Sequence, residues 1–479
     1  MRIIPTRSKA LKVSLALMSV MTLAMPVSAM AQEDAQTALV RKTIAENHVS
    51  GVSYEALANQ SIEQMIAGLK DPYTTLFSPE QFTDFNDYLE NNFVGVGCVI
   101  GLDDQGVYVS KTIPGSPAEA GGLLKDDYIR YVDGVPASTT SIDEVRSKII
   151  GEAGTKVKVT VLRDKKELTF ELTRAAVNSP EVYSSRFAGG VGYMQILDFS
   201  SDADEEFDKQ ITALQEQGLK SLILDVRDNP GGYLETAQHI AKHFVKDGVL
   251  IHTKDRNGVD EPVLIQNGTS LAIPVYILAN ENSASASEVL SGALQDYQVA
   301  KVIGTQTYGK GSVQQLFDIS DKSVLKVTVQ EYLTPNKRKV NKIGITPDIK
   351  VDGSAAQLIT ALHETGISDV NVTFTKRGVT YNGVDTGYGF GSFWDKDHLF
   401  ASTRGLAALI GAKITWNETN HTVDITDDKG THAFAVDKDQ MVLENGYSYM
   451  NVDLFHTFFP QLKVNTQGDT VSIQGTKGN

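Results

Sequence analysis

Cysteine is almost absent from this sequence: Cys98 is the only one among 479 residues. A single cysteine excludes an internal disulfide, so stability outside the cytoplasm would have to come from packing alone. Cys98 lies in an apolar run that reads as a strand, which predicts a small core residue. The chain is also too long for one core, and its length predicts several domains.

Positive charge is scarce as well, with 44 lysines and arginines against 59 acidic residues and a formal net charge of −15. Such a chain is a poor partner for nucleic acid. The acidic residues form no long run, so a solvated, soluble surface explains them. His398, His421 and His456 lack the spacing of metal ligands. Neither a metal nor another cofactor is therefore expected.

A complete phosphate-binding loop is missing, although GTQTYGKGSVQQ at 304–315 comes within one residue of it. The nucleotide-binding motif needs Ser or Thr directly after its lysine, and here Gly311 follows Lys310. The chain then continues into SVLKVTVQEYL, whose alternation predicts a strand rather than a phosphate-capping helix. ATP-dependent chemistry is thereby disfavoured, and Lys310 needs another role.

The N-terminus has a basic beginning followed by an uncharged stretch over 13–31 that ends in Ala29-Met30-Ala31. This is the layout of a secretory signal peptide over residues 1–31, which predicts an exported, extracytoplasmic protein. The alternative is an uncleaved membrane anchor, but several serines, a threonine and a proline make the stretch weakly apolar for a span.

The rest of the chain divides into four parts. Residues 32–90 are predicted to be a helical N-terminal region, including LKDPYTTLF at 69–77. Short strands separated by glycine turns occupy 91–175, with a helix in SIDEVRSKII and a strand in TKVKVTVLR. Residues 176–353 alternate apolar strands with amphipathic helices, which predicts an α/β core. Few contacts are expected to cross from there into a separate module at 370–479.

The second part resembles a PDZ domain. The resemblance rests on the loop Val94-Gly95-Val96-Gly97, the segment GSPAEAGGL at 115–123 and the turn Val132-Asp133-Gly134. It implies that amides of the 94–97 loop bind the terminal carboxylate of a peptide, which then adds as a strand. The alternative is an ordinary small β-domain whose glycines serve turns.

The last part carries an internal repeat at an offset of 48 residues, in which LAALIGAKITWNETNHTVDI at 406–425 is echoed by LFHTFFPQLKVNTQGDTVSI at 454–473. Its first copy resembles the small domain at the N-terminus of copper amine oxidases. A small α+β domain without a copper site is therefore expected.

The serine cluster SASASE at 283–288 lies at a predicted junction between a strand and a helix. Ser285 and Glu288 fit a capping box, so a purely structural reading exists. A nucleophilic serine would also profit from this place, because a helix N-terminus offers free amides to an oxyanion. No G-x-S-x-G motif is present, and no histidine is nominated as base; His239 and His243 could simply share a helix face.

Lysine is the other base that such a serine can use. Lys310 would need burial to lower its pKa from about 10.4 before it could accept a proton near neutral pH. Gly309 and Gly311 suit a tight buried turn, and Gln314 lies four residues further on, where its side chain could orient the amine.

SASASE, YGKGSVQQ, ILDVRDNPGGYL at 223–234 and LKDPYTTLF together resemble the carboxyl-terminal processing peptidases, over about residues 50–350. The resemblance implies a serine endopeptidase with a core similar to the crotonase and Clp-protease fold and a PDZ domain inserted before it. It assigns Ser285 as nucleophile, Lys310 as general base and Gln314 as the residue that orients it. It further places the oxyanion hole at the amides of Ala286 and of Gly231-Gly232.

The implied partners are proteins or peptides with exposed C-terminal tails. A homo-oligomer through the N-terminal helices and association with the cell envelope are further expectations. The rival hypothesis is an inactive, PDZ-containing scaffold protein. This rival hypothesis is disfavoured because a core that had lost its activity should have lost at least one of the motif residues. The sequence keeps them all: Ser285, Lys310, Gln314 and the Asn229-Pro-Gly-Gly232 segment.

Overall fold

The structure is a computed structural model, and it describes residues 34–89, 92–103, 105–138, 141–178, 180–375, 378–396, 398–437, 440–444, 446–468 and 470–478. The predicted signal peptide at 1–31 lies outside these residues. Across the part of the chain that is described, no helix has both the length and the apolar character needed to cross a membrane.

The N-terminal region contains the helices α1 (Ala35–Asn47), α2 (Ile62–Gly68) and α3 (Pro79–Leu89). The predicted helix at 69–77 is wrong, because Thr75–Phe77 forms strand β1 and pairs with β18 (Val324–Leu333). The Asp71 carboxylate accepts hydrogen bonds from the Tyr73 amide and the Thr74 hydroxyl, which fixes a turn before the strand. Proline and β-branched threonines in this segment also disfavour helix.

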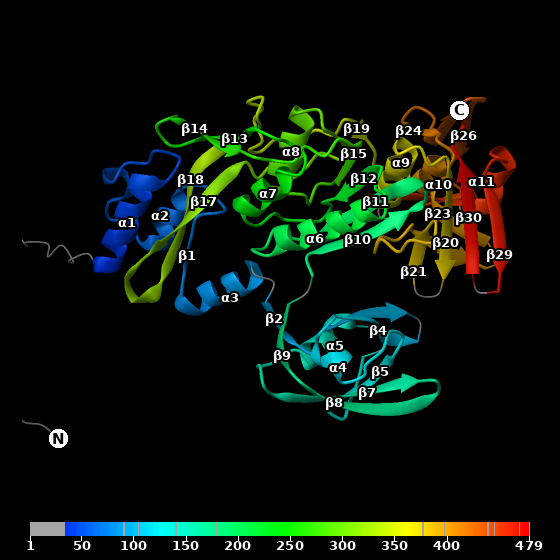
Figure 1. Cartoon of the computed structure of the whole chain (residues 1–479), viewed down its shortest axis with the longest axis horizontal. Helices are drawn as coiled ribbons and strands as arrows, with labels where there is room; N and C mark the ends of the chain where they lie inside the picture. Colours follow the sequence, from blue (N-terminus) through cyan, green and yellow to red (C-terminus); the bar gives the residue numbers. More distant parts are fainter. Residues whose placement is uncertain are drawn as a thin grey trace, which may run out of the picture.

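The PDZ part is a separate body with its own core, suspended below the rest of the molecule on a two-stranded ribbon (Figure 1). The ribbon pairs β2 (Asn92–Gly95) with β9 (Ala175–Asn178). The predicted helix and strand are confirmed as α5 (Ile142–Ile149) and β7 (Lys156–Arg163). The remaining elements are β3 (Cys98–Asp103), β4 (Gly106–Thr112), α4 (Pro117–Ala120), β5 (Tyr128–Val132), β6 (Val135–Pro136) and β8 (Lys166–Thr173).

The α/β core is a six-stranded sheet in the order β10-β11-β12-β15-β16-β19. Strand β10 is antiparallel to its neighbour and the other pairs are parallel. Parallel strands covered on both faces need apolar residues throughout, as the sequence has. The strands are β10 (Val182–Phe187), β11 (Val191–Ile196), β12 (Ser221–Asp225), β15 (Val275–Ala279), β16 (Ala300–Gly304) and β19 (Ile349–Lys350).

Alternate residues of these strands pack into two different cores. Leu222 and Leu224 face helices α6 (Ala203–Glu216), α7 (Leu234–Ala241) and α8 (Ala286–Asp296). Ile223 faces the opposite side, toward α9 (Ser354–Glu364) and the C-terminal domain. The period of two along a strand therefore decides which residue reaches which core.

A second sheet joins the N-terminal helices to the core. Its order is β1-β18-β13-β14, and β17 (Ser312–Asp318) pairs with β18. Strands β13 (Gly248–Lys254) and β14 (Asp260–Ile265) form its hairpin. Side chains of α1 and α2 pack on Leu325 and Val327 of β18, so the N-terminal region covers one face of this sheet.

The C-terminal repeat is a repeat of structure as well, because each copy folds as a helix followed by a hairpin. The first copy is α10 (Thr403–Leu409), β24 (Lys413–Asn417) and β25 (Thr422–Asp427). The second is α11 (Val452–Phe458), β29 (Lys463–Gln467) and β30 (Thr470–Thr476). The other strands are β20 (Asp369–Thr375), β21 (Gly378–Tyr381), β22 (Ser392–Asp395), β23 (His398–Ser402), β26 (Gly430–Ala435), β27 (Met441–Glu444) and β28 (Tyr447–Asn451).

This domain does not stand apart, and the expectation that few contacts cross near residues 353–370 is wrong. One continuous hydrophobic core runs from Ile223 and Ile303 of the central sheet through Leu358 of α9 to Val372 and Leu406 of the C-terminal domain. Residues 354–369 fall in neither of the predicted domains; they contain α9, which buries apolar side chains against both partners.

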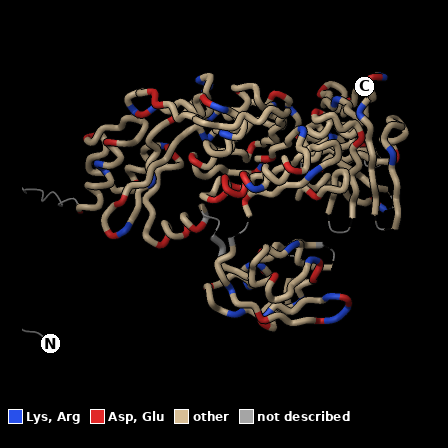
Figure 2. The backbone as a smooth tube through the Cα atoms, viewed as in Figure 1, with Lys and Arg blue, Asp and Glu red and all other residues tan. Residues whose placement is uncertain are grey.

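Acidic and basic residues are interspersed over all parts of the molecule, as Figure 2 shows. A few charged side chains are instead buried in the α/β core. Asp225 and Glu288 are completely buried, and Arg227 is 1% exposed. Buried charges are costly unless they are paired, so these three mark a constrained region of the fold.

Candidate active site

Ser285 lies directly before helix α8, at the junction that the sequence predicts. Its backbone has φ 54° and ψ −114°, a conformation that non-glycine residues rarely adopt. A Cβ atom at Gly231 would come within 2.7 Å of Ser285 Cβ, so the 231–232 turn must be glycine for the two segments to meet. Strain of this kind persists only where the surroundings impose it, and it concentrates at functional sites.

Glu288 connects the serine to the lysine loop. Its carboxylate accepts hydrogen bonds from the amides of Ser285 (3.0 Å), Gly309 (2.7 Å) and Lys310 (2.8 Å) and from the Thr307 hydroxyl (2.6 Å). Glu288 therefore does more than cap α8, because most of its hydrogen bonds come from the 307–310 segment. Burial raises the pKa of Glu288, although these hydrogen bonds act in the opposite direction.

Lys310 sits in the tight turn that its flanking glycines permit. A Cβ atom at Gly311 would lie 2.1 Å from the Asn341 amide nitrogen, which excludes any side chain there. The Lys310 side chain lines a cavity of about 460 Å³ together with Ser285 and Gln314. Burial lowers the pKa of Lys310, partly offset by the negative charge of Glu288. This is the change that a lysine base requires.

Gln314 reaches the same cavity from β17. Its amide nitrogen donates to Ser312 Oγ (2.9 Å) and Thr328 Oγ1 (3.4 Å). These bonds fix the Gln314 side chain beside the lysine, while its role in orienting Lys310 stays a prediction.

Two further residues of β18 line the cavity, and the sequence reading missed both. The Tyr332 hydroxyl lies 3.1 Å from the Ser285 carbonyl oxygen and 3.0 Å from that of Lys310. Lys326 places its Nζ 4.6 Å from the ring centre of Phe85. Burial, together with the positive charge of Lys310, lowers the pKa of Lys326. The sequence offers no simple signal for either, because an irregularity in pairing between Thr328 and Gln330 interrupts the period of two along this strand.

The predicted oxyanion donors differ in their present bonds. The Gly231 amide donates to Asn229 Oδ1 at 2.8 Å, so it serves the local turn. Ala286 begins α8, where a helix leaves its first amides without internal partners. The amides of Ala286 and Gly232 are therefore the stronger candidates. The Asn229 side chain also donates to the Ile196 carbonyl, which anchors the turn to β11.

The PDZ groove opens beside this cavity. Val94, Gly95, Val96 and Gly97 all line a second cavity of about 550 Å³, bounded by Arg146 and other residues of α5. Gly97 has φ 76°, and a Cβ atom there would lie 2.2 Å from Ser116 Cβ, so the loop depends on glycine.

Asp198 and Pro230 line both cavities, which makes the two sites neighbours. Asp198 Oδ1 is buried without a hydrogen-bond partner, and burial raises the pKa of Asp198 to about 7. The sequence reading missed this residue because a single aspartate after a strand carries no motif.

The histidines serve other contacts. His239 of α7 bonds Asp204 of α6 at 2.5 Å, and His243, two residues beyond the end of α7, bonds Asp208 of α6 at 2.6 Å. No histidine is among the described residues that line the catalytic cavity. Within the described ranges, no three His, Cys, Asp or Glu side chains are grouped so that they could hold a metal ion.

An α/β core in which a serine before a buried helix and a buried lysine line one cavity, next to a PDZ groove, is typical of serine hydrolases that act on peptides. Residues 190–351 match the model of peptidase family S41, and residues 108–163 match a PDZ domain. A carboxyl-terminal-processing protease of Synechocystis sp. is 36% identical over 300 residues, which cover 61% of this chain and 70% of the relative. The carboxy-terminal processing protease CtpB of Bacillus subtilis is 33% identical over 341 residues, covering 69% and 71%.

The chain therefore belongs to peptidase family S41, among the carboxyl-terminal processing proteases, and it is a serine endopeptidase. Among solved structures, a photosystem II D1 C-terminal processing protease is 28% identical and covers 68% of this chain and 95% of its own, with a TM-score of 0.46.

Proposed function

We propose that the protein cleaves peptide bonds with a Ser285–Lys310 dyad and selects substrates by their C-terminal tails through the PDZ groove. The observation that carries this proposal is the single cavity in which Ser285 meets a lysine whose pKa is lowered by burial. Neutral Lys310 takes the proton of Ser285 Oγ as the oxygen attacks the scissile carbonyl carbon.

The amides of Gly232 and Ala286 stabilise the oxyanion of the tetrahedral intermediate. Protonated Lys310 then gives its proton to the leaving amine, and the acyl–enzyme ester remains on Ser285. A water molecule, deprotonated by Lys310, attacks the ester carbon. The bond to Ser285 Oγ then breaks, the protonated lysine returns its proton to this oxygen, and the product leaves with a free carboxyl group. Gln314 limits the orientations of the lysine, and Glu288 keeps the two catalytic segments in register through four hydrogen bonds.

The PDZ groove supports selection of chain ends. Amides of the 94–97 loop would hold the terminal carboxylate, and the apolar side chains of the groove would take the last residues of the tail. Because Asp198 and Pro230 border both cavities, an extended chain leaving the groove enters the catalytic cavity without crossing a separate surface.

Residues 1–31 would direct export and place the enzyme at or beyond the cell envelope. A homo-oligomer through α1 and α2 is a further part of the proposal. The exposed apolar side chains of Leu39 and Tyr54 in this region are consistent with such a contact.

An inactive scaffold is the competing function. It is disfavoured because the strained Ser285, the buried Lys310 and the glycine turn all coincide in one cavity. An inactive core has no reason to retain such strain.

The test compares the mature wild-type chain with Ser285→Ala and Lys310→Ala on an unfolded substrate that ends in an apolar tail. Each variant should lose activity by several orders of magnitude, and the double variant should lose little more, because the two residues act as a unit. Circular dichroism and tail-peptide binding serve as controls of the fold. If Lys310→Ala cleaves at close to the wild-type rate and Lys326→Met is inactive, the general base is Lys326 and not Lys310.

A further inference from the structure

The loop between β12 and α7 holds the proposed oxyanion donor Gly232 in an unusual conformation. Asp228 has φ 59°, Gly231 has φ 113° and Gly232 has φ 141°. Glycine adopts positive φ readily, but for Asp228 this conformation is unfavourable, so the surroundings must hold it.

Part of this support comes from the peptidase core itself. Arg227 and Asp225 form a buried ion pair, with Nε to Oδ1 at 2.9 Å and Nη2 to Oδ2 at 2.5 Å. Arg227 Nη1 donates to the Ser354 carbonyl at 2.7 Å, which ties the loop to α9. The Tyr193 hydroxyl donates to Asp225 Oδ2 at 2.7 Å.

Asp228 connects the same loop to the segment before the nucleophile. Its amide donates to Asn280 Oδ1 at 3.0 Å, and its carboxylate accepts from Asn280 Nδ2 (2.9 Å) and Asn282 Nδ2 (2.8 Å). One residue further, the Asn229 carbonyl accepts from the Ala284 amide and the Ser287 hydroxyl, on either side of Ser285. A displacement of Asp228 would therefore reach both the oxyanion turn and the serine.

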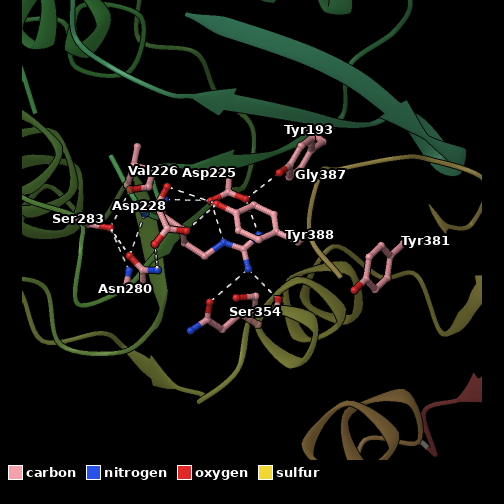
Figure 3. Close-up of polar contacts among 12 residues, drawn as sticks. Tyr193, Asp225, Val226, Asp228, Asn280, Ser283, Ser354, Tyr381, Gly387 and Tyr388 are labelled. Carbon is pink, nitrogen blue, oxygen red and sulfur yellow. Dashed lines mark hydrogen bonds and ion pairs between the residues drawn. The ribbon is translucent and has the colours of Figure 1, made fainter. Parts of the chain in front are cut away.

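The remaining support comes from the C-terminal domain, beyond the matched peptidase segment. Tyr388 lies on the connection between β21 and β22, and Figure 3 shows its side chain beside Asp225 and Asp228. Its ring stands over the Arg227 guanidinium. Arg227 Cζ is 3.8 Å from the ring centre. The Tyr388 hydroxyl lies 3.3 Å from the Arg227 carbonyl oxygen and 3.4 Å from Asp228 Oδ2. One side chain thus contacts the buried cation, the loop backbone and Asp228.

We propose that Tyr388 is a positioning residue for the oxyanion site, so that the C-terminal domain contributes to catalysis by this peptidase. The inference rests on the proposed function. The ring completes the enclosure of Arg227 by a cation–π contact, which is strongest where the cation is desolvated. The shared hydrophobic cluster, which contains no residue of the 227–232 loop, holds the two bodies together.

The expected effect lies in the chemical step. Misplacement of catalytic groups by about 1 Å can cost about a hundredfold in rate. Tyr388→Leu, which removes the ring, should lower kcat by about ten- to a hundredfold and leave KM for a tail-bearing peptide within about twofold. Tyr388→Phe keeps the ring and removes only the hydroxyl, whose hydrogen bonds to the Arg227 carbonyl and Asp228 are long, so it should retain most of the activity.

The experiment measures the rate at which a fluorophosphonate probe labels Ser285, together with binding of a fluorescent tail peptide and the unfolding midpoint. Tyr447→Leu is the matched control, because Tyr447 belongs to the same domain and is 52% exposed. Slower labelling in Tyr388→Leu, with unchanged peptide binding and rescue by Tyr388→Phe, supports the proposal. Equal labelling of Tyr388→Leu and wild type overturns it.

Two other outcomes are informative. If Tyr388→Leu does not fold, Tyr388→Met, which also lacks the ring, decides: labelling slowed about tenfold or more supports the proposal, and labelling at the wild-type rate overturns it. If wild-type protein is not labelled, or if Ser285→Ala is labelled equally, the proposed dyad fails instead, which separates that failure from a failure at Tyr388.

Discussion

At the scale of single residues, burial gives Lys310 and Asp198 properties that their residue types do not have in water. Both side chains line the catalytic cavity, and in both cases loss of solvent disfavours the charged form. The direction of the pKa shift is opposite for an amine and a carboxyl. Each shift leads to its own pH experiment.

The first experiment concerns the pH dependence of cleavage. Burial lowers the pKa of Lys310, so neutral amine accumulates at lower pH than for a free lysine. We expect kcat/KM to rise with pH as Lys310 loses its proton, without a limb near pH 6.5 of the kind a histidine base produces. A profile measured on a short tail-bearing peptide checks this. A limb near 6.5 that disappears on replacing a single histidine would contradict it.

The second experiment concerns stability. The pKa of Asp198 is raised from 3.8 to about 7, so the folded protein binds more protons than the unfolded chain between these values. Stability from this group is therefore lost as pH rises through that window, by up to about 4 kcal/mol. Asp198→Asn should become more stable relative to wild type at pH 8 than at pH 5, as urea unfolding measures. If the stability difference between Asp198→Asn and wild type does not change with pH, the pKa of Asp198 is not raised in the folded protein.

At the scale of elements, the catalytic arrangement depends on how α8 meets the 307–310 segment. Glu288 lies one turn inside the helix and accepts three backbone amides from two separate pieces of chain. Helix α8 therefore positions the base loop as well as the nucleophile. A capping box is recognised from sequence, but a cap that also binds a distant loop is not.

Glu288→Gln tests this connection. Glutamine has one acceptor oxygen and would direct its NH₂ group at amides that also donate. Leaving buried donors unsatisfied costs about 1–3 kcal/mol each, so we expect a loss of at least about 2 kcal/mol in unfolding free energy and a large loss of activity. Glu281→Gln, at an exposed position in the turn before α8, is the control. Unchanged stability would mean that the four bonds contribute little.

The PDZ domain is the second element with a testable role. Amidation of a substrate's C-terminus removes the charge that the 94–97 amides would hold, and it should slow cleavage by about tenfold or more at low substrate concentration. The same peptide with a conservative internal change is the control. Equal cleavage rates for substrates with free and amidated C-termini would show that the groove does not recognise the terminal carboxylate.

At the scale of the whole molecule, the C-terminal domain is joined to the peptidase core by a continuous hydrophobic cluster and by Tyr388. Truncation after about residue 370 removes the partners of buried side chains on α9, among them Leu358 and Leu362. Burial of one such side chain contributes about 1.5–3 kcal/mol, so we expect a lower unfolding midpoint and loss of cleavage. Calorimetry and a peptide assay check both, and a truncated chain with full stability and activity would contradict the shared core.

Most of the core was predictable from sequence because its signals are local. Periodicity identified strands β11, β12, β15 and β16 and helices α6, α7 and α8, and short motifs pointed to Ser285 and Lys310. Two elements escaped: the segment at 69–77 is predicted as helix but contains strand β1, and α9 lies in residues 354–369, for which no element is predicted. In both, the deciding contacts come from residues far away in the chain.

The sequence by itself determined the residue types, their local conformations and the family, since turns, caps and amphipathic periods depend on neighbours along the chain. Only the tertiary structure decided the burial that lowers the pKa of Lys310, the hydrogen bonds that Glu288 makes to a second segment, and the placement of Tyr388 over Arg227. These features arise between residues 22 to 161 positions apart, where packing rather than local preference sets the distance.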